Sequence, residues 1–578
     1  MTRFTRSALL TVSLALPAAA QPQPTDAPAA ADRIQADVSH LASPLLKGRR
    51  AGTPEADAAA DWLAARFAAI GLAPAGAFGT WFQTFSFIDG VDLGPGNALV
   101  TTRGTMTKSW AVGEDFRPLA FSAAGTVSGE VVFAGYGITA KDLSWDDYAG
   151  LDVKDKIVLV LRYSPDGDDE KSPFSPFAAL RFKASLAREK GAKAVLVATG
   201  PLTKDVADAL VAMRTDAAFA DAGIVALSVK RPVAEALFAG SGTTLEAAQK
   251  AIDDARKPAS FALPGAKASL VADVTPHRVT TRNVIGLLSN PNGLRKEEIL
   301  VVGAHYDHLG SGGSTSLDAS GKAQIHPGAD DNASGVGALL DLARLFAGRR
   351  SSLQRSILFI SFGAEEEGTL GSLHFTKSPT VPLASVVAMV NLDMVGRLRD
   401  DKLILHGVGT SPAWRPLIDK ANEEAKLTLS FHEGGFGPSD HSPFYAAKLP
   451  VLFAFTGAHP DYHKPTDTPD KIQAAGIARI DAFLLPVLEG VLNAPERIAF
   501  TPVKEEASPR GGRSFRVWVG GIPDFSEEKP GVRFSGVTGG SPAEKAGVRA
   551  GDLLVRFGDK EIRNIYDYTY ALQGRKPG

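Results

Sequence analysis

The sequence has 578 residues, enough for about four domains of ordinary size, and 44% of them are hydrophobic, which excludes a mainly disordered chain. Lysine and arginine total 62 against 64 aspartates and glutamates, so the chain has no overall electrostatic attraction for nucleic acid or anionic membranes. There is no cysteine, which excludes disulfides and thiolate metal sites. Any bound metal must therefore be held by His, Asp and Glu.

The first 20 residues are typical of an export signal. Arg3 and Arg6 precede an apolar run over residues 8–16, and three alanines at 18–20 offer a cleavage site. This run is too short to span a bilayer, and no later stretch is apolar enough for a transmembrane segment. We expect a periplasmic or secreted protein, with a flexible Pro- and Ala-rich leader over residues 21–31.

The next 240 or so residues form two segments that differ in their predicted secondary structure. An amphipathic pattern predicts a helix over 56–70 that ends at Gly71, inside a first domain segment, 32–111. Short strands and turns follow over 112–270, and we interpret this stretch as an insert. Its expected elements are strands at 131–134, 156–161 and 194–198 and a helix at 178–189.

Residues 271–493 are typical of an α/β domain with a mostly parallel, doubly wound sheet, because strands and helices alternate there. Four near-continuous apolar runs predict buried strands, at 299–303, 356–362, 385–392 and 451–455. Polar side chains follow each run: His305 and Asp307, then Glu365 and Glu366, then Asp393, then Tyr462 and His463. Asp330 and Asp331 precede a helix expected at 336–346. In open α/β sheets ligands bind beyond the carboxyl ends of the strands, so these side chains should converge.

This donor set favours a metal centre with two ions. Each residue alone is more often structural: a histidine after a strand packs in the core, and an aspartate before a helix caps it. Together, two His, two Asp and one Glu exceed the three protein ligands of one catalytic zinc, but they suit two ions if one carboxylate bridges. Burying several carboxylates is also costly unless cations neutralise them. A bend at the strand end would let Glu365 and Glu366 act separately as general base and ligand.

Five ordered motifs resemble the co-catalytic di-zinc exopeptidase family, which includes bacterial secreted aminopeptidases, glutamate carboxypeptidase and glutaminyl cyclase. They are residues 305–307, 328–335, 364–368, 391–394 and 462–467, and the resemblance covers about 36–111 and 283–493. It implies two Zn²⁺ ions per chain. In that reading the site residues are His305 and Asp393 on one zinc, Glu366 and His463 on the other, and Asp331 (or, as the alternative, Asp330) as the bridge.

The same resemblance implies the roles of the remaining residues. Glu365 would be the general base for a hydroxide shared by the two metals, Asp307 would orient His305, and Tyr462 would donate to the oxyanion. We expect His308 and His326 to be structural, and we assign no ligand role to the segment Ser439-Asp440-His441.

The implied function is that of a secreted aminopeptidase that removes N-terminal residues from peptide substrates. Two alternatives stay open. A carboxypeptidase or dipeptidase would keep the chemistry and use a cation such as Arg397 to bind the substrate carboxylate. A glutaminyl cyclase would need one zinc ion.

Two further regions resemble accessory domains. The insert is similar to a protease-associated domain, through segments such as 135–138 and 155–160. A linker is expected over 494–513, and residues 514–578 resemble a PDZ domain that lacks the last strands of the usual pattern. The resemblance places a loop that binds peptide C-termini at Val519, Gly520, Gly521 and Ile522.

Overall fold

The computed structural model describes residues 27–169, 171–204, 206–213, 221–313, 315–503, 517, 519–523, 530–537, 541–549, 551–573 and 575. The expected export signal lies outside these residues. Helix α1 (Ala27–Leu41) begins within the segment predicted to be a flexible leader, which corrects that boundary. Ile34, Val38 and Leu41 lie one helical turn apart and are fully buried, so the helix is fixed by packing of one face.

A nine-stranded sheet forms the centre of the largest domain. Its order is β1-β13-β15-β14-β16-β19-β17-β18, with β2 paired to β13, and the neighbours of β14 and the pair β16–β19 run parallel. The α/β fold with a doubly wound sheet, predicted from the sequence, is confirmed. The sheet is mixed and not mostly parallel as predicted, because β13 pairs antiparallel with β1, β2 and β15, and β17 pairs antiparallel with β19. The strands are β1 (Ala73–Pro74), β2 (Phe82–Leu93), β13 (Val274–Leu288), β14 (Arg295–His305), β15 (Arg355–Phe362), β16 (Val386–Leu392), β17 (Lys402–His406), β18 (Thr428–His432) and β19 (Val451–Phe455).

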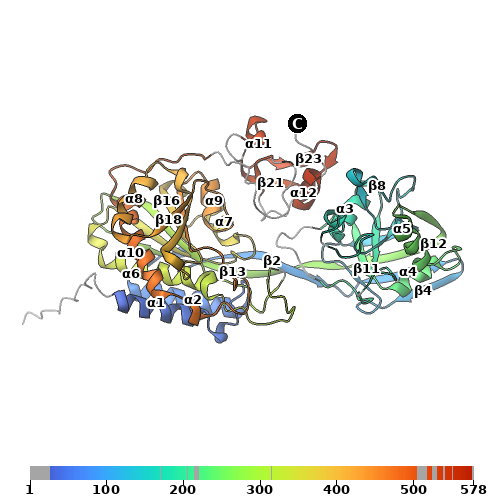
Figure 1. Cartoon of the computed structure of the whole chain (residues 1–578), viewed down its shortest axis with the longest axis horizontal. Helices are drawn as coiled ribbons and strands as arrows, with labels where there is room; N and C mark the ends of the chain where they lie inside the picture. Colours follow the sequence, from blue (N-terminus) through green and yellow to red (C-terminus); the bar gives the residue numbers. More distant parts are fainter. Residues whose placement is uncertain are drawn as a thin grey trace, which may run out of the picture.

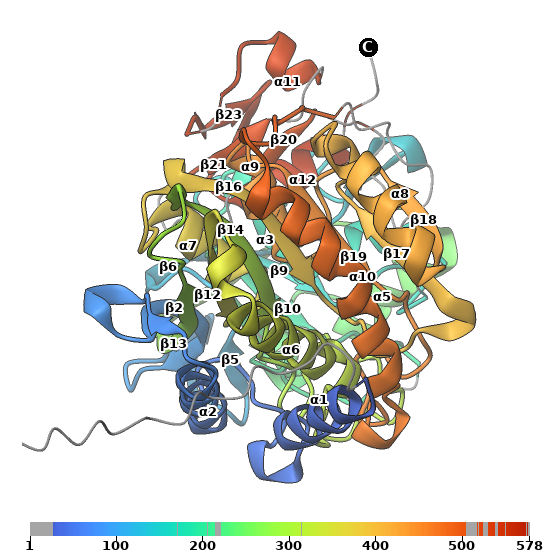
Figure 2. The same ribbon diagram turned by 90° about the vertical axis from the view of Figure 1, so that its left-hand side faces the viewer.

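Helices cover both faces of this sheet. Leu300 and Val302 of β14 pack on one face, while Ile299 and Val301 pack on the other, as expected for alternating side chains of a buried strand. Figure 2 shows α1, α6 and α10 side by side over the first face. The helices of that face are α1, α2 (Pro54–Ile70), α6 (Gly335–Gly348), α8 (Trp414–Ala425) and α10 (Ala474–Asn493); those of the other are α7 (Leu370–Lys377) and α9 (His441–Ala446).

The insert is a second α/β domain, joined to the first by the long antiparallel pair β2–β13 (Figure 1). Its eight-stranded sheet has the order β4-β3-β12-β6-β9-β10-β11-β5. Strands β3 and β4 pair within this sheet, so residues 98–110 belong to the insert and not, as we predicted, to the first domain. The strands are β3 (Ala98–Arg103), β4 (Met106–Trp110), β5 (Phe116–Pro118), β6 (Gly125–Phe133), β9 (Ile157–Leu161), β10 (Ala194–Ala198), β11 (Val225–Val229) and β12 (Phe261–Ala272); a small pair, β7 (Thr139–Ala140) and β8 (Trp145–Asp146), and helices α3 (Leu180–Glu189), α4 (Arg231–Phe238) and α5 (Leu245–Ala255) accompany them.

A small C-terminal module lies between the two larger domains (Figure 1). Its core contains Val532, Phe534, Ile562 and Tyr568. The elements are β20 (Gly521–Pro523), β21 (Val532–Val537), α11 (Pro542–Lys545), β22 (Leu553–Leu554), β23 (Arg556–Phe557), β24 (Lys560–Glu561) and α12 (Ile565–Gln573). Within the described residues, none of the helices has the length and apolarity needed to cross a membrane.

Candidate metal centre

The carboxyl ends of three parallel strands bring the predicted residues to one rim. His305 is the last residue of β14, Glu365 and Glu366 follow β15, and Asp393 directly follows β16. Asp331 lies in the turn 329–334 that precedes α6. This is the position at which an open α/β sheet forms its ligand site.

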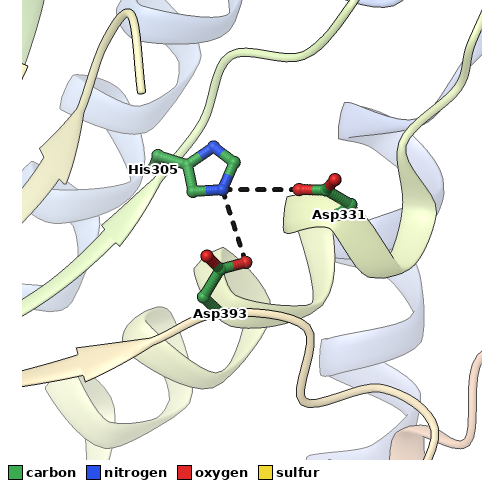
Figure 3. Close-up of side chains that lie close together, drawn as sticks. All are labelled: His305, Asp331 and Asp393. Carbon is green, nitrogen blue, oxygen red and sulfur yellow. Dashed lines mark ion pairs between the residues drawn. The ribbon is translucent and has the colours of Figure 1, made fainter. Parts of the chain in front are cut away.

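His305, Asp331 and Asp393 form the first group of donors (Figure 3). His305 Nε2 lies 3.4 Å from Asp331 Oδ1 and 3.4 Å from Asp393 Oδ1. All three residues are buried, yet His305 Nε2 and Asp393 Oδ1 have no hydrogen-bond partner. Buried polar atoms are normally paired, so these orphaned atoms fit a cation between them.

His463 and Glu366 form the second group, again with Asp331. His463 Nε2 lies 3.2 Å from Asp331 Oδ2 and 3.2 Å from Glu366 Oε2. The two oxygens of one carboxylate therefore face two different histidines. Asp330, the alternative bridge, turns away from both groups: its Oδ2 lies 3.1 Å from His459 Nε2, and its Oδ1 accepts the backbone N–H of Gly396.

His308 also reaches the second group, although we predicted that it is structural. Its Nδ1 lies 2.6 Å from Glu366 Oε1 and 3.8 Å from Asp331 Oδ2, and with these residues it forms a second possible cation site. The signal in the sequence is its position three residues after His305, just beyond the end of β14. His326, by contrast, contacts Ser316 Oγ and the carbonyl of Gln324.

Asp307 does not hold His305 through its carboxylate. His305 Nδ1 is 3.2 Å from the backbone carbonyl of Asp307 but 3.9 Å from its Oδ1. The carboxylate instead accepts the backbone N–H groups of Glu365 (3.0 Å) and Glu366 (3.3 Å). Asp307 therefore orients the two glutamates, and the predicted contact to His305 is made by its main chain.

Glu365 lies beside the first group without joining it. Its Oε2 is 3.8 Å from His305 Nε2. Burial raises the pKa of Glu365 well above its usual range, and the neighbouring carboxylates of Asp440 and Asp393 add to this against the opposing effect of His305. A carboxylate with a raised pKa, next to the donors but not among them, has the properties of a general base.

Tyr462 lies against the second group. Its ring stacks on that of His463, with the centroids 3.9 Å apart. Burial raises its pKa, and so do the carboxylates of Asp331, Glu366, Asp393 and Glu365. The hydroxyl therefore stays protonated and is available as a hydrogen-bond donor.

Asp393 is held by the segment that follows β18. Ser439 Oγ donates to Asp393 Oδ2 at 2.7 Å, and Asn391 Nδ2 donates to Ser439 Oγ at 2.8 Å. These bonds fix the orientation of the carboxylate and leave Asp393 Oδ1 without a hydrogen-bond partner, which is how outer residues orient a metal ligand.

A cavity of about 770 Å³ opens beside Glu366. Arg50, Asp89 and Glu367 line it together with residues of the 309–323 loop, and Met213 contributes from the insert. Space for a substrate is therefore present next to the donors.

The loop that we predicted to bind peptide C-termini, at residues 519–522, lies at the start of β20. Gly521 is paired with Val537 of β21, and the carbonyl of Val519 accepts the backbone N–H of Ala543 in α11. Gly520 precedes the strand with a φ of 84°. Peptide binding at Val519–Ile522 stays a prediction.

The doubly wound sheet thus carries two groups of His and carboxylate donors at its carboxyl rim, each of which could hold a cation. Residues 283–488 match Peptidase family M28, and residues 533–578 match the PDZ domain. These two matches fall on the segments whose motifs indicated a zinc exopeptidase and a PDZ domain. The protease-associated character of the insert stays a prediction.

Relatives of known name match part of the chain. Aminopeptidase YwaD of Bacillus subtilis is 31% identical over 214 residues, which cover 34% of this chain and 43% of that protein. A probable leucine aminopeptidase of Arthroderma otae is 30% identical over 31% of this chain and 50% of its own length. The chain thus spans half or less of these two relatives. An aminopeptidase structure from Aneurinibacillus sp. strain AM-1 has a TM-score of 0.48 at 23% identity, over 82% of this chain and 96% of that one.

Proposed function

We propose that this protein is a secreted, zinc-dependent aminopeptidase with two zinc ions per chain. One observation carries the proposal: the two oxygens of Asp331 face His305 and His463 separately, so that one carboxylate serves two donor groups. The M28 match and the aminopeptidases among the relatives support peptides as the substrates.

The residues present fit zinc, which accepts nitrogen and oxygen donors. His305 and Asp393 would hold one ion, Glu366 and His463 the other, and Asp331 both; His308 is an additional donor for the second. Bound zinc polarises the peptide carbonyl and makes water a better nucleophile.

The chain itself supplies the proton transfers. Glu365 takes a proton from the attacking water and passes it to the leaving amine, which its raised pKa favours. The hydroxyl of Tyr462, protonated throughout the neutral range, donates a hydrogen bond to the oxygen on which negative charge develops.

The alternative activities receive less support from the site. Arg397, a candidate for binding a substrate carboxylate, is occupied: its Nη2 lies 3.0 Å from Asp467 Oδ1 and its Nη1 lies 3.6 Å from Asp461 Oδ2. A glutaminyl cyclase, with one zinc ion, would not need both donor groups.

The test combines metal analysis with substrates. We expect two zinc ions per chain and hydrolysis of aminoacyl arylamides but not of their N-acetylated forms. Cleavage of N-blocked peptides from the carboxyl end would instead identify a carboxypeptidase, and one zinc ion with cyclisation of N-terminal glutamine would identify a cyclase.

The variant E365Q tests the general base. We expect kcat to fall about 10²–10⁴-fold, since that is the usual contribution of general base catalysis, while the zinc content stays unchanged. The control is E489Q, which alters a partly exposed glutamate of α10 paired with Arg349. Retained activity in E365Q would contradict the assignment.

Export is proposed from Arg3, Arg6 and the apolar run after them. The expected outcome is a mature protein that begins after residue 20, and N-terminal sequencing of protein from the periplasm or medium checks it. The PDZ domain is proposed to bind peptide C-termini, which a binding assay with free and amidated peptides tests.

A further inference from the structure

Arg49 is a fully buried arginine beside the metal centre, in the loop between α1 and α2. Each of its five N–H donors points at a backbone carbonyl oxygen. Nε donates to Tyr306 (2.6 Å), Nη1 to Leu41 (3.1 Å) and Pro327, and Nη2 to Gly328 (2.7 Å) and Asp331 (3.4 Å).

These carbonyl groups belong to the segments that carry the metal donors. Tyr306 follows His305 directly, whereas Gly328 and Asp331 belong to the turn with the shared carboxylate. The main chain of the Arg49 loop adds bonds of its own, because His308 N donates to the carbonyl of Arg49 and Gly310 N to that of Gly48. A planar guanidinium has its donors in a fixed geometry, so it sets the separation of the segments it joins.

The charge of Arg49 is unusual in its surroundings. No carboxylate among the described residues lies within ion-pair distance of it. Burial lowers its pKa to about 10, and the carboxylates of Asp331, Asp307, Asp467 and Glu366 oppose this shift from a greater distance. The side chain therefore places a fixed positive charge near several carboxylates that would otherwise repel one another.

We propose that Arg49 is a positioning residue of the metal centre. It fixes the end of β14 against the Gly328–Asp331 turn, so that Asp331 faces both histidines before a cation binds. The proposal rests on the proposed function only because it takes the cation to be zinc. Arg49 itself contacts neither the side chains of the metal donors nor the substrate.

The experiment compares two pairs of variants in the full chain. R49K keeps the positive charge but loses the planar guanidinium with its fixed donors, and R49M loses both. R355K and R355M are matched controls, because Arg355 is also buried and donates to Glu298 and to the carbonyl groups of Val491 and Ala494, away from the centre. For each variant we would measure zinc affinity by competition with a chelator, the melting temperature of the zinc-free chain, and kcat and KM.

We expect R49K to bind zinc about 10–100-fold more weakly, the usual cost of losing an outer residue that orients metal ligands, and R49M to bind it more weakly still. In both, kcat should fall more than KM changes. The Arg355 variants should lower the melting temperature and leave zinc affinity unchanged.

Wild-type zinc affinity in R49K would overturn the proposal, even if R49M did not fold. Equal losses of zinc affinity in R49K and R355K would also overturn it, since they would reflect general destabilisation. A wild-type chain that binds zinc but cleaves no peptide would contradict the proposed function alone, and the zinc affinities would still test Arg49.

Discussion

Glu365 and Glu366 are adjacent in sequence, yet their side chains have different partners. Glu366 Oε2 lies 3.2 Å from His463 Nε2, and its Oε1 lies 2.6 Å from His308 Nδ1. Burial and Asp331 raise the pKa of Glu366, but His308 and His463 outweigh them, so it is lowered. The pKa of Glu365 is instead raised. The division into ligand and base thus follows from which histidines each carboxylate meets.

His308 gives a prediction at the same scale. In H308A we expect the zinc affinity of the group formed by Glu366, His463 and Asp331 to fall about 10–100-fold, because Glu366 loses the imidazole that contacts its second oxygen. The zinc affinity of the His305 group should change little. Zinc titration of the zinc-free chain measures both.

H374A is the control for H308A, since His374 of α7 stacks on Phe85 and belongs to neither donor group. If H308A titrated like the wild type, His308 would be a structural residue, as its sequence context had suggested to us.

The sequence predicts the metal-donor residues better than it predicts the residues that hold them in place. His305 and Asp393 end apolar runs and could be placed at the rim from that pattern alone. Arg49 and the carboxylate contacts of Asp307 could not, because they join segments whose approach depends on the folded loops. Arg49 is separated from Gly328 by 279 residues, and no periodicity encodes such a contact.

At the scale of elements, burial explains which strands could be predicted. β15, β16 and β19 are buried throughout or almost so, and their apolar runs mark them clearly. In β18, exposed and half-buried residues alternate, and we did not predict it. β3 and β4 were assigned to the first domain because β12, the strand that joins β3 to the rest of the second sheet, follows about 160 residues later, beyond any local signal.

Helix α3 carries a testable pH dependence. Burial lowers the pKa of Lys183 from 10.5 to about 7, against the opposing effect of Asp147, and Nζ donates to the carbonyl groups of Leu161 and Tyr163. Between about pH 7 and 10.5 the unfolded chain holds this proton and the folded chain does not. Stability contributed by this group therefore rises with pH in that window, by at most about 1.4 kcal/mol per pH unit.

K183M cannot titrate, so we expect its stability to gain less than that of the wild type between pH 7 and 10. Calorimetric melting at several pH values checks this. K193M, which alters an exposed lysine of the same domain, should follow the wild type. Parallel pH profiles for wild type and K183M would show that Lys183 has no depressed pKa.

At the scale of the whole molecule, the C-terminal module contacts both larger domains. β21 lies against α9 of the largest domain, and α12 lies against α3 of the insert. In the second contact the ring of Tyr570 meets that of Phe182 edge-on, with centroids 5.0 Å apart, and Asn564 Nδ2 donates to the carbonyl of Asp221. The module therefore links the two domains by a second route besides β2 and β13.

An ion pair between Arg188 of α3 and Asp567 of α12 also joins the C-terminal module to the insert. Their atoms Nη2 and Oδ2 are 2.8 Å apart, and only 11% and 1% of the two side chains are exposed. Removing one partner of a buried pair leaves a charge without compensation, at a cost of about 3–5 kcal/mol. We therefore expect R188M to release the module, with faster hydrogen exchange in α12 and a larger radius of gyration in solution scattering.

The double variant R188M/D567N should recover part of the contact because no buried charge remains, whereas R415M, which breaks an exposed pair with Asp419, should change neither readout. Unchanged exchange in R188M would mean that the aromatic contact and the Asn564 hydrogen bond suffice to hold the module.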